Sequence, residues 1–182
     1  MSRRSGMHGF TLIELMITLA LLAIVANIAL PNFATLIRDN QLQGKAEELV
    51  AFLQYARSTA VANRQTILIE PGANNAAWVV SIKVQQPANA VAEGEDEDSP
   101  PEPLPNIPLR QFIPDSSQAA VLSSRASFEY APNGTASATA RITLCRASDA
   151  ASGYLINVGA SGATRLLPRG KDTNGTLASC TP

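Results

Sequence analysis

Few residues of this 182-residue chain could carry acid–base, nucleophilic or metal chemistry. The single histidine is His8, and the two cysteines, Cys145 and Cys180, stand far apart. If the chain is cut after Gly9, the mature protein has no histidine, which removes the usual general base and the commonest metal ligand. The sequence contains no Gly-rich phosphate loop, CxxC pair or HExxH motif. We therefore expect no enzyme activity, no cofactor and no metal site.

The most informative segment is residues 10–30, an apolar run in which Glu14 is the only charged residue. As a helix that rises about 1.5 Å per residue, it is long enough to cross the roughly 30 Å hydrocarbon core of a bilayer. Arg3 and Arg4 precede the run. The positive-inside rule then keeps the N-terminus in the cytoplasm and sends the rest of the chain outward.

Three ordinary kinds of N-terminal segment are the alternatives. A secretory signal peptide has a shorter apolar run that ends in a small-x-small cleavage site, whereas residues 26–29 are Ala-Asn-Ile-Ala. A twin-arginine signal continues with apolar residues, whereas Ser5-Gly6-Met7 follows Arg3-Arg4 here. A plain transmembrane anchor leaves the carboxylate of Glu14 unexplained.

Glu14 is costly at this position, because an acidic residue costs about 2.5 to 3.5 kcal/mol at mid-bilayer and less near the helix end. A carboxylate in a membrane therefore usually has a partner. A cut before Phe10 would create an α-amino group, and the amino group of a neighbouring subunit can reach Glu14. The alternative is that the Glu14 side chain extends to the lipid headgroups.

The segment Gly9-Phe10-Thr11-Leu12-Ile13-Glu14 resembles the processing site of type IV prepilins and type II secretion pseudopilins, and the short basic leader, residues 1–9, matches too. The resemblance implies that a prepilin peptidase cuts between Gly9 and Phe10 and N-methylates Phe10. It implies that Glu14 is needed for assembly with other pilin or pseudopilin subunits. It also implies a single-pass inner-membrane protein with a periplasmic head, which is incorporated into a pilus or pseudopilus.

Residues 31–63 are expected to continue the helix as an amphipathic stem. Apolar residues recur at helical spacing from Ala46 to Val61, and charged residues take the other faces. Pro31 and Gly44 are the two weak points of this helix. Residues 48–61, ELVAFLQYARSTAV, resemble a helix of one branch of the family, which comprises the H-type pseudopilins and the FimT and FimU minor pilins.

Residues 64–182 are expected to form a β-rich head. Residues 78–85 alternate apolar and polar side chains, the period of a half-buried strand. Further strands are expected over residues 65–69, 109–113, 119–122, 127–130, 141–146, 153–158 and 164–167. Short strands with short connections favour an antiparallel sheet, and a stem helix covering one face makes this the α+β pilin fold.

Two features of the head stand out. Residues 86–108 mix prolines with a cluster of six acids and are expected to form a long, flexible, exposed loop, either for partner contact or simply solvated. Cys145 and Cys180 fit one disulfide of an exported domain, worth about 3 to 4 kcal/mol on chain-entropy grounds. Two buried free thiols are the alternative.

Arg165, Arg169 and Lys171 are the candidates for contact with DNA. DNA-binding members of the branch carry a Gly-Arg-x-Arg motif at this end, whereas this chain has Gly162-Ala163-Thr164-Arg165 and lacks the first arginine. With a net charge of −1 as well, nucleic acid is not expected as a partner. The resemblance leaves three functions in order of preference: a minor pilin for initiation or the tip of a type IV pilus, an H-type pseudopilin of type II secretion, and a DNA-binding pilin for transformation.

Intact-mass analysis of the protein extracted from membranes tests the processing site. We expect a mature chain that begins at Phe10 and carries one N-methyl group, because the cut precedes the apolar run. A mature chain beginning after Ala26 or Ala29 would instead identify an ordinary secretory signal peptide.

Overall fold

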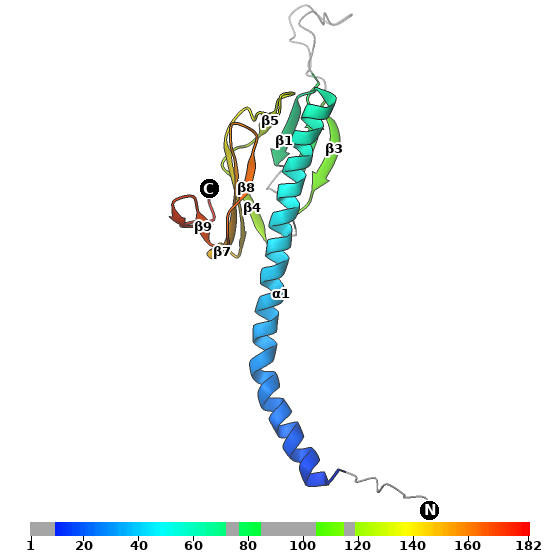
Figure 1. The fold of residues 1–182 in the computed structure, drawn as a ribbon, viewed down its shortest axis with the longest axis vertical. Coiled ribbons are helices and arrows are strands. Elements are labelled where there is room, and N and C mark those ends of the chain that lie inside the picture. Colours follow the sequence, from blue (N-terminus) through cyan, green and yellow to red (C-terminus); the bar gives the residue numbers. More distant parts are fainter. Residues whose placement is uncertain (1–9, 72–76, 85–104, 115–118) are drawn as a thin grey trace, which may run out of the picture. The chain divides into compact units, whose positions relative to one another are not determined.

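The structure of the chain, a computed structural model, describes residues 10–71, 77–84, 105–114 and 119–182. The leader with Gly9, and most of the segment predicted as an acidic loop, lie outside these ranges. The chain divides into two compact units, Met1–Asn40 and Gln41–Pro182. One helix, α1 (Leu12–Asn63), contributes to both units, and it continues through Pro31 and Gly44 without interruption (Figure 1).

The second unit is built on the part of α1 that follows Asn40. The buried side chains of this part recur every three or four residues, so they form one stripe along the helix. They are Leu42, Ala46, Leu49, Phe52, Leu53, Ala56 and Ala60.

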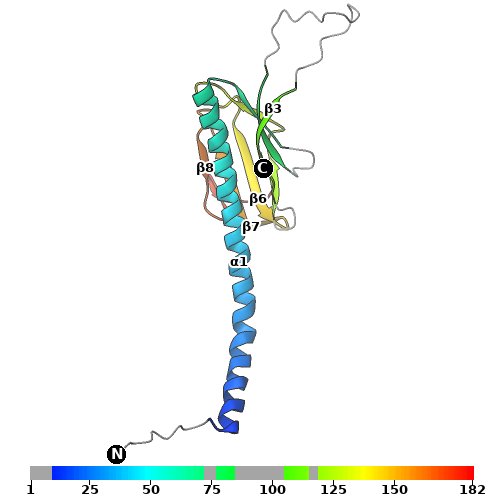
Figure 2. The same cartoon turned by 90° about the vertical axis from the view of Figure 1, so that its right-hand side faces the viewer.

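Two antiparallel four-stranded sheets pack with this stripe. The first has the order β3-β2-β1-β5 and consists of β1 (Ile67–Pro71), β2 (Trp78–Ile82), β3 (Ile107–Phe112) and β5 (Phe128–Tyr130). The second has the order β4-β6-β7-β8 and consists of β4 (Ala120–Ser123), β6 (Ala140–Arg146), β7 (Asp149–Val158) and β8 (Thr164–Leu166). Figure 2 shows this part of α1 alongside the long strands β6 and β7.

One hydrophobic core joins the helix stripe to the inner faces of both sheets. Alternate residues of β1, β2, β5, β6 and β7 face it, and β3 contributes Phe112, whose ring lies 5.9 Å from that of Phe52 on α1. The fully buried strand residues are Ile67, Ile69, Trp78, Val80, Tyr130, Ile142, Leu144, Leu155 and Ile156, all of which except Leu155 belong to this core. The predicted α+β fold, a long helix on antiparallel sheet, is confirmed, with two sheets in place of one.

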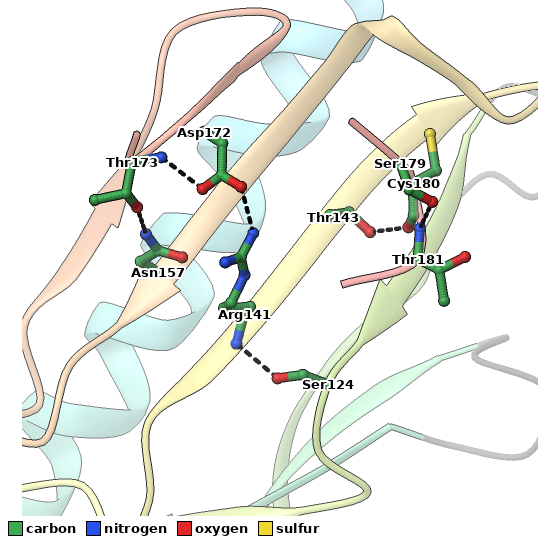
Figure 3. Close-up of polar contacts among 9 residues, drawn as sticks. All are labelled: Ser124, Arg141, Thr143, Asn157, Asp172, Thr173, Ser179, Cys180 and Thr181. Atoms are coloured by element: carbon green, nitrogen blue, oxygen red, sulfur yellow. Dashed lines mark hydrogen bonds and ion pairs between the residues drawn. The ribbon is translucent and has the colours of Figure 1, made fainter. Parts of the chain in front are cut away.

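The C-terminal segment covers the face of the second sheet that points away from the helix. It includes a hairpin of β9 (Lys171–Asp172) and β10 (Gly175–Thr176). The Cys145–Cys180 disulfide, with a Cα–Cα distance of 6.0 Å, ties its end to β6, and the Thr143 hydroxyl donates a hydrogen bond to the Cys180 carbonyl (Figure 3). Together with Leu155, Leu167 and Leu177, the two cysteines form a second, smaller apolar cluster.

Gly153 of β7 gives this disulfide the room it needs. A Cβ atom at this position would lie 2.6 Å from the Cys145 Sγ atom, well inside the distance that such atoms tolerate. Only glycine therefore fits opposite the bridge.

Each predicted strand differs from the observed one by one to four residues at one end or at both. β3 begins at Ile107, so the loop predicted to reach residue 108 is wrong at its end. β7 begins at Asp149 instead of residue 153, because Ala147 and Ser148, with φ of 47° and 64°, form a tight turn that pairs Arg146 with Asp149. The strands β9 and β10 were not predicted, since two-residue strands have no alternation to detect.

Replacing Cys145 with serine should lower the free energy of unfolding of a fragment starting at Gln41 by about 3 to 4 kcal/mol. The bridge constrains the unfolded chain, and without it only the small apolar cluster holds the C-terminal segment. Denaturant unfolding measures the loss, and the unaltered fragment in reductant should lose the same amount. Two titratable thiols in the oxidised fragment would contradict the bridge.

Candidate processing and assembly site

In the described part of the first unit, α1 exposes its apolar side chains. Sixteen large hydrophobic side chains between Phe10 and Ile37 are at least half exposed. By length and composition, this helix could cross a membrane. Monomeric soluble proteins rarely expose a continuous apolar surface of this size, so it needs lipid or another apolar surface as its neighbour.

Glu14 lies in the first turn of α1, inside this apolar surface. The Glu14 backbone N–H donates a hydrogen bond of 3.2 Å to the Thr11 hydroxyl, so Thr11 caps the helix. A carboxylate in the first turn also interacts favourably with the positive end of the helix dipole. Within the described part of the chain, no residue pairs with the Glu14 carboxylate, which leaves it available to a partner from outside.

Phe10, which would follow the expected cut, precedes the helix and is 76% exposed. The other side of the cut, Gly9, lies outside the described residues. Sequence reasoning assigned no role to Thr11, although the Thr-x-x-Glu pattern of Thr11 and Glu14 is a known sign of a helix start.

Apart from Glu14, the polar side chains within the apolar part of α1 bond to the helix's own backbone. The side chains of Thr18, Asn27, Asn32 and Thr35 each donate to a carbonyl three or four residues earlier, at 2.7 to 3.2 Å. Donors satisfied in this way do not need water. At these four positions the helix can therefore tolerate an apolar environment.

Arg57, in the second unit, links α1 to two turns of the head. Its Nε atom donates to the Gly134 carbonyl at 2.9 Å and its Nη2 atom to the Ser161 carbonyl at 3.2 Å. The two turns meet so closely that a Cβ atom on Gly162 would lie 2.0 Å from the Gly134 oxygen. The sequence motif contained Arg57, but its spacing gave no sign of partners so far along the chain.

The three basic residues predicted as DNA contacts lie on three segments. Arg165 is on β8, Lys171 is on β9, and Arg169 lies between them. Arg165 is paired in register with Asn157 of β7, which in turn is paired with Arg141 of β6. The structure therefore aligns Arg165 with Arg141, a residue that the sequence did not single out.

Side chains of the C-terminal hairpin bind two residues of this row, Arg141 and Asn157 (Figure 3). Arg141 Nη2 forms an ion pair with Asp172 Oδ2 at 2.7 Å, and Asn157 Nδ2 donates to the Thr173 hydroxyl at 3.0 Å. The hydrogen bond from Arg141 lowers the pKa of the Asp172 carboxyl. Because Asp172 neutralises Arg141, the row presents less positive charge than its sequence suggests.

Comparison with known proteins identifies two matching sequence families. Residues 45–162 match the family described as type II transport protein GspH, and residues 4–29 match the prokaryotic N-terminal methylation motif. A search of curated proteins gave no match.

Solved structures of the type IV minor pilin FimU of Pseudomonas aeruginosa (strain PAO1) share the fold. One crystal form is 24% identical, with a TM-score of 0.55 over 78% of this chain and 96% of that chain. Another is also 24% identical, with a TM-score of 0.52 over 76% of this chain and 98% of that chain.

The GspH match covers well over half of the sequence, and the methylation motif covers the start of the apolar helix. The chain therefore belongs to the GspH family of pilin-like proteins, whose members are structural subunits and not enzymes.

Proposed function

We propose that this chain is a minor pilin of a type IV pilus, a subunit present in few copies that acts in initiation or at the tip of the filament. The observation that carries this choice is the disulfide-closed C-terminal segment, which follows residue 162 and so lies beyond the GspH match. A C-terminal disulfide of this kind resembles the minor pilins of the FimU type more than it resembles the pseudopilins. The fold shared with FimU, a type IV minor pilin, supports the same choice.

The second candidate is an H-type pseudopilin of a type II secretion system. The match to type II transport protein GspH over residues 45–162 favours it. Both candidates use the same helix and the same head, so they differ only in the filament that the subunit enters.

Processing and location follow from the N-terminal motif. We propose that a prepilin peptidase removes residues 1–9 and methylates Phe10. Residues 10–30 then lie in the inner membrane, residues 31–63 form the stem, and residues 64–182 form the periplasmic head. The methylation motif, the basic leader and the exposed apolar helix support this arrangement.

We further propose that Glu14 binds the N-terminal amine of a neighbouring subunit during assembly. The carboxylate lies near the helix start, where a processed N-terminus of the same kind would also lie. Its lack of a partner among the described residues supports the proposal, because a carboxylate in an apolar environment is stable only when paired.

Glu14→Ala should leave membrane insertion intact or improve it, because it removes a charge from the apolar segment. Recovery of the subunit in sheared filaments should fall at least about tenfold, which corresponds to about 1.4 kcal/mol of lost interaction. Immunoblots of membranes and sheared filaments measure both. Glu47→Ala, an exposed carboxylate of the same helix, is the matched control. Unchanged incorporation of Glu14→Ala would rule out the role.

Deleting the gene in its native host distinguishes the two filaments. We expect surface pili and twitching motility to be lost or strongly reduced while extracellular protein secretion continues, with both restored by the unaltered gene. Loss of secretion with normal pili would identify the pseudopilin instead.

Gel-shift titration with double-stranded DNA tests the third function at two salt concentrations. We expect no shift at tens of micromolar protein, since Asp172 neutralises Arg141 and three separate charges give few phosphate contacts. Micromolar binding that weakens with salt and disappears in Arg165→Ala/Arg169→Ala would revive the DNA-uptake function.

A further inference from the structure

The edge of the first sheet carries most of the exposed apolar side chains of the head. Among the described residues of Gln41–Pro182, four large hydrophobic residues are exposed: Val61, Ile107, Leu109 and Ile113. Three of these four belong to β3 or follow it directly, and Ile113 is 63% exposed. The exposed apolar surface of this unit is therefore concentrated on one strand.

β3 is also an open edge for backbone hydrogen bonds. It pairs with β2 on one side, and no described strand pairs with its other side. The opposite edge of the same sheet is covered, because Ala136 bridges to Tyr130 and the Ser137 N–H donates to the Glu129 carbonyl at 2.8 Å. Unpaired backbone groups together with exposed apolar side chains are what strand addition by another chain requires.

The edge strands of the second sheet lack this combination. β4 has four residues and β8 has three, and neither carries an exposed large hydrophobic side chain. β3 is thus distinguished from every other edge strand in the described part of the head.

The positive charge of Arg110 on β3 favours an acidic partner. Arg110 is the only charged residue of β3, and its guanidinium lies over the ring of Tyr55, 5.1 Å from the centroid. No carboxylate in the described ranges pairs with it. An acidic side chain opposite Arg110 on an added strand would gain an attractive cross-strand pair. A second copy of β3 paired about Arg110 would instead place two arginines opposite each other.

The open edge of β3 is interrupted near its N-terminal end. Pro108 has no N–H to donate, and the register between β3 and β2 shifts between Val80 and Ser81, the partners of Arg110 and Pro108. Leu109 lies at this shift and has no partner on β2, and from Arg110 to Phe112 β3 keeps a regular register with β2.

We propose that Leu109–Ile113 is a docking edge, which binds an extended segment of another protein chain with alternating apolar and acidic side chains. Binding occurs by strand addition, with the acidic side chain opposite Arg110. This interaction goes beyond the proposed function, since it concerns what the head binds and is independent of the filament that the subunit enters.

The test uses the full chain in lipid nanodiscs and two synthetic peptides of about ten residues. In one peptide valine alternates with glutamate, and in the other with lysine. Fluorescence anisotropy measures binding, and hydrogen–deuterium exchange locates it. The glutamate peptide should bind about threefold to tenfold more tightly than the lysine peptide and protect the amides of Leu109–Phe112.

Charge variants at Arg110 make the test specific. Arg110→Glu should reverse the preference between the peptides, and Arg110→Gln should abolish it. Arg125→Glu, an exposed arginine outside the strands, is the matched control and should leave the preference unchanged.

Equal affinity for the two peptides, an unchanged preference in Arg110→Glu, or protection at another strand would overturn the proposal. Cross-linking of two full-length copies through Leu109→Cys would also overturn it, because a second copy would then be the occupant. Filament recovery is scored separately, so a failure here is distinguishable from a failure of the minor-pilin function.

Discussion

The apolar first half of α1 cannot remain in contact with water. Sixteen large hydrophobic side chains are exposed between Phe10 and Ile37, and full burial of each is worth roughly 1.5 to 3 kcal/mol. The described residues of this unit, 10–40, offer no core in which to bury them, so the surface must be covered by lipid or by another apolar surface. Apart from Glu14, the polar side chains of this segment donate to the helix backbone, so at their positions both environments are acceptable.

The head, residues 41–182, buries its apolar side chains in a core of its own. From Leu42 onward, α1 has a buried stripe that completes a core with two sheets, and Arg57 ties the helix to two turns. A disulfide holds a second apolar cluster on the far face of the second sheet. Because the head has its own core, the first half of α1 can exchange one apolar environment for another while the head keeps its structure. A subunit that moves from a membrane into a filament needs a head whose structure does not depend on the environment of the apolar helix.

Much of this organisation could be predicted from the sequence, because the signals are local. An apolar run with one carboxylate, an apolar stripe at helical spacing, and the alternation of residues 78–85 each determine their own element. The helix end at Asn63 and most strands agree with the prediction for this reason. The even cysteine count in an exported chain similarly predicted the Cys145–Cys180 bridge.

What could not be predicted depends on contacts between distant residues. The division into two sheets follows from which strands meet across the core, and the partners of Arg57 lie in turns near Gly134 and Ser161. The early start of β7 depends on left-handed backbone at Ala147 and Ser148, which neither residue type favours. The neutralisation of Arg141 by Asp172 requires a hairpin of two-residue strands that leave no pattern in the sequence.

The proposed role of Glu14 is to bring the apolar helix into a filament by binding the N-terminal amine of its neighbour. A membrane-permeant carbodiimide, which joins carboxylates to amines in direct contact, tests this in intact filaments. Mass spectrometry of the cross-linked peptides should find the Glu14 side chain joined to the methylated N-terminal phenylalanine of another subunit, and Glu14→Gln should remove this product. If Glu14 reacts with the reagent alone and no inter-subunit bond forms, the carboxylate faces lipid or solvent and the account is contradicted.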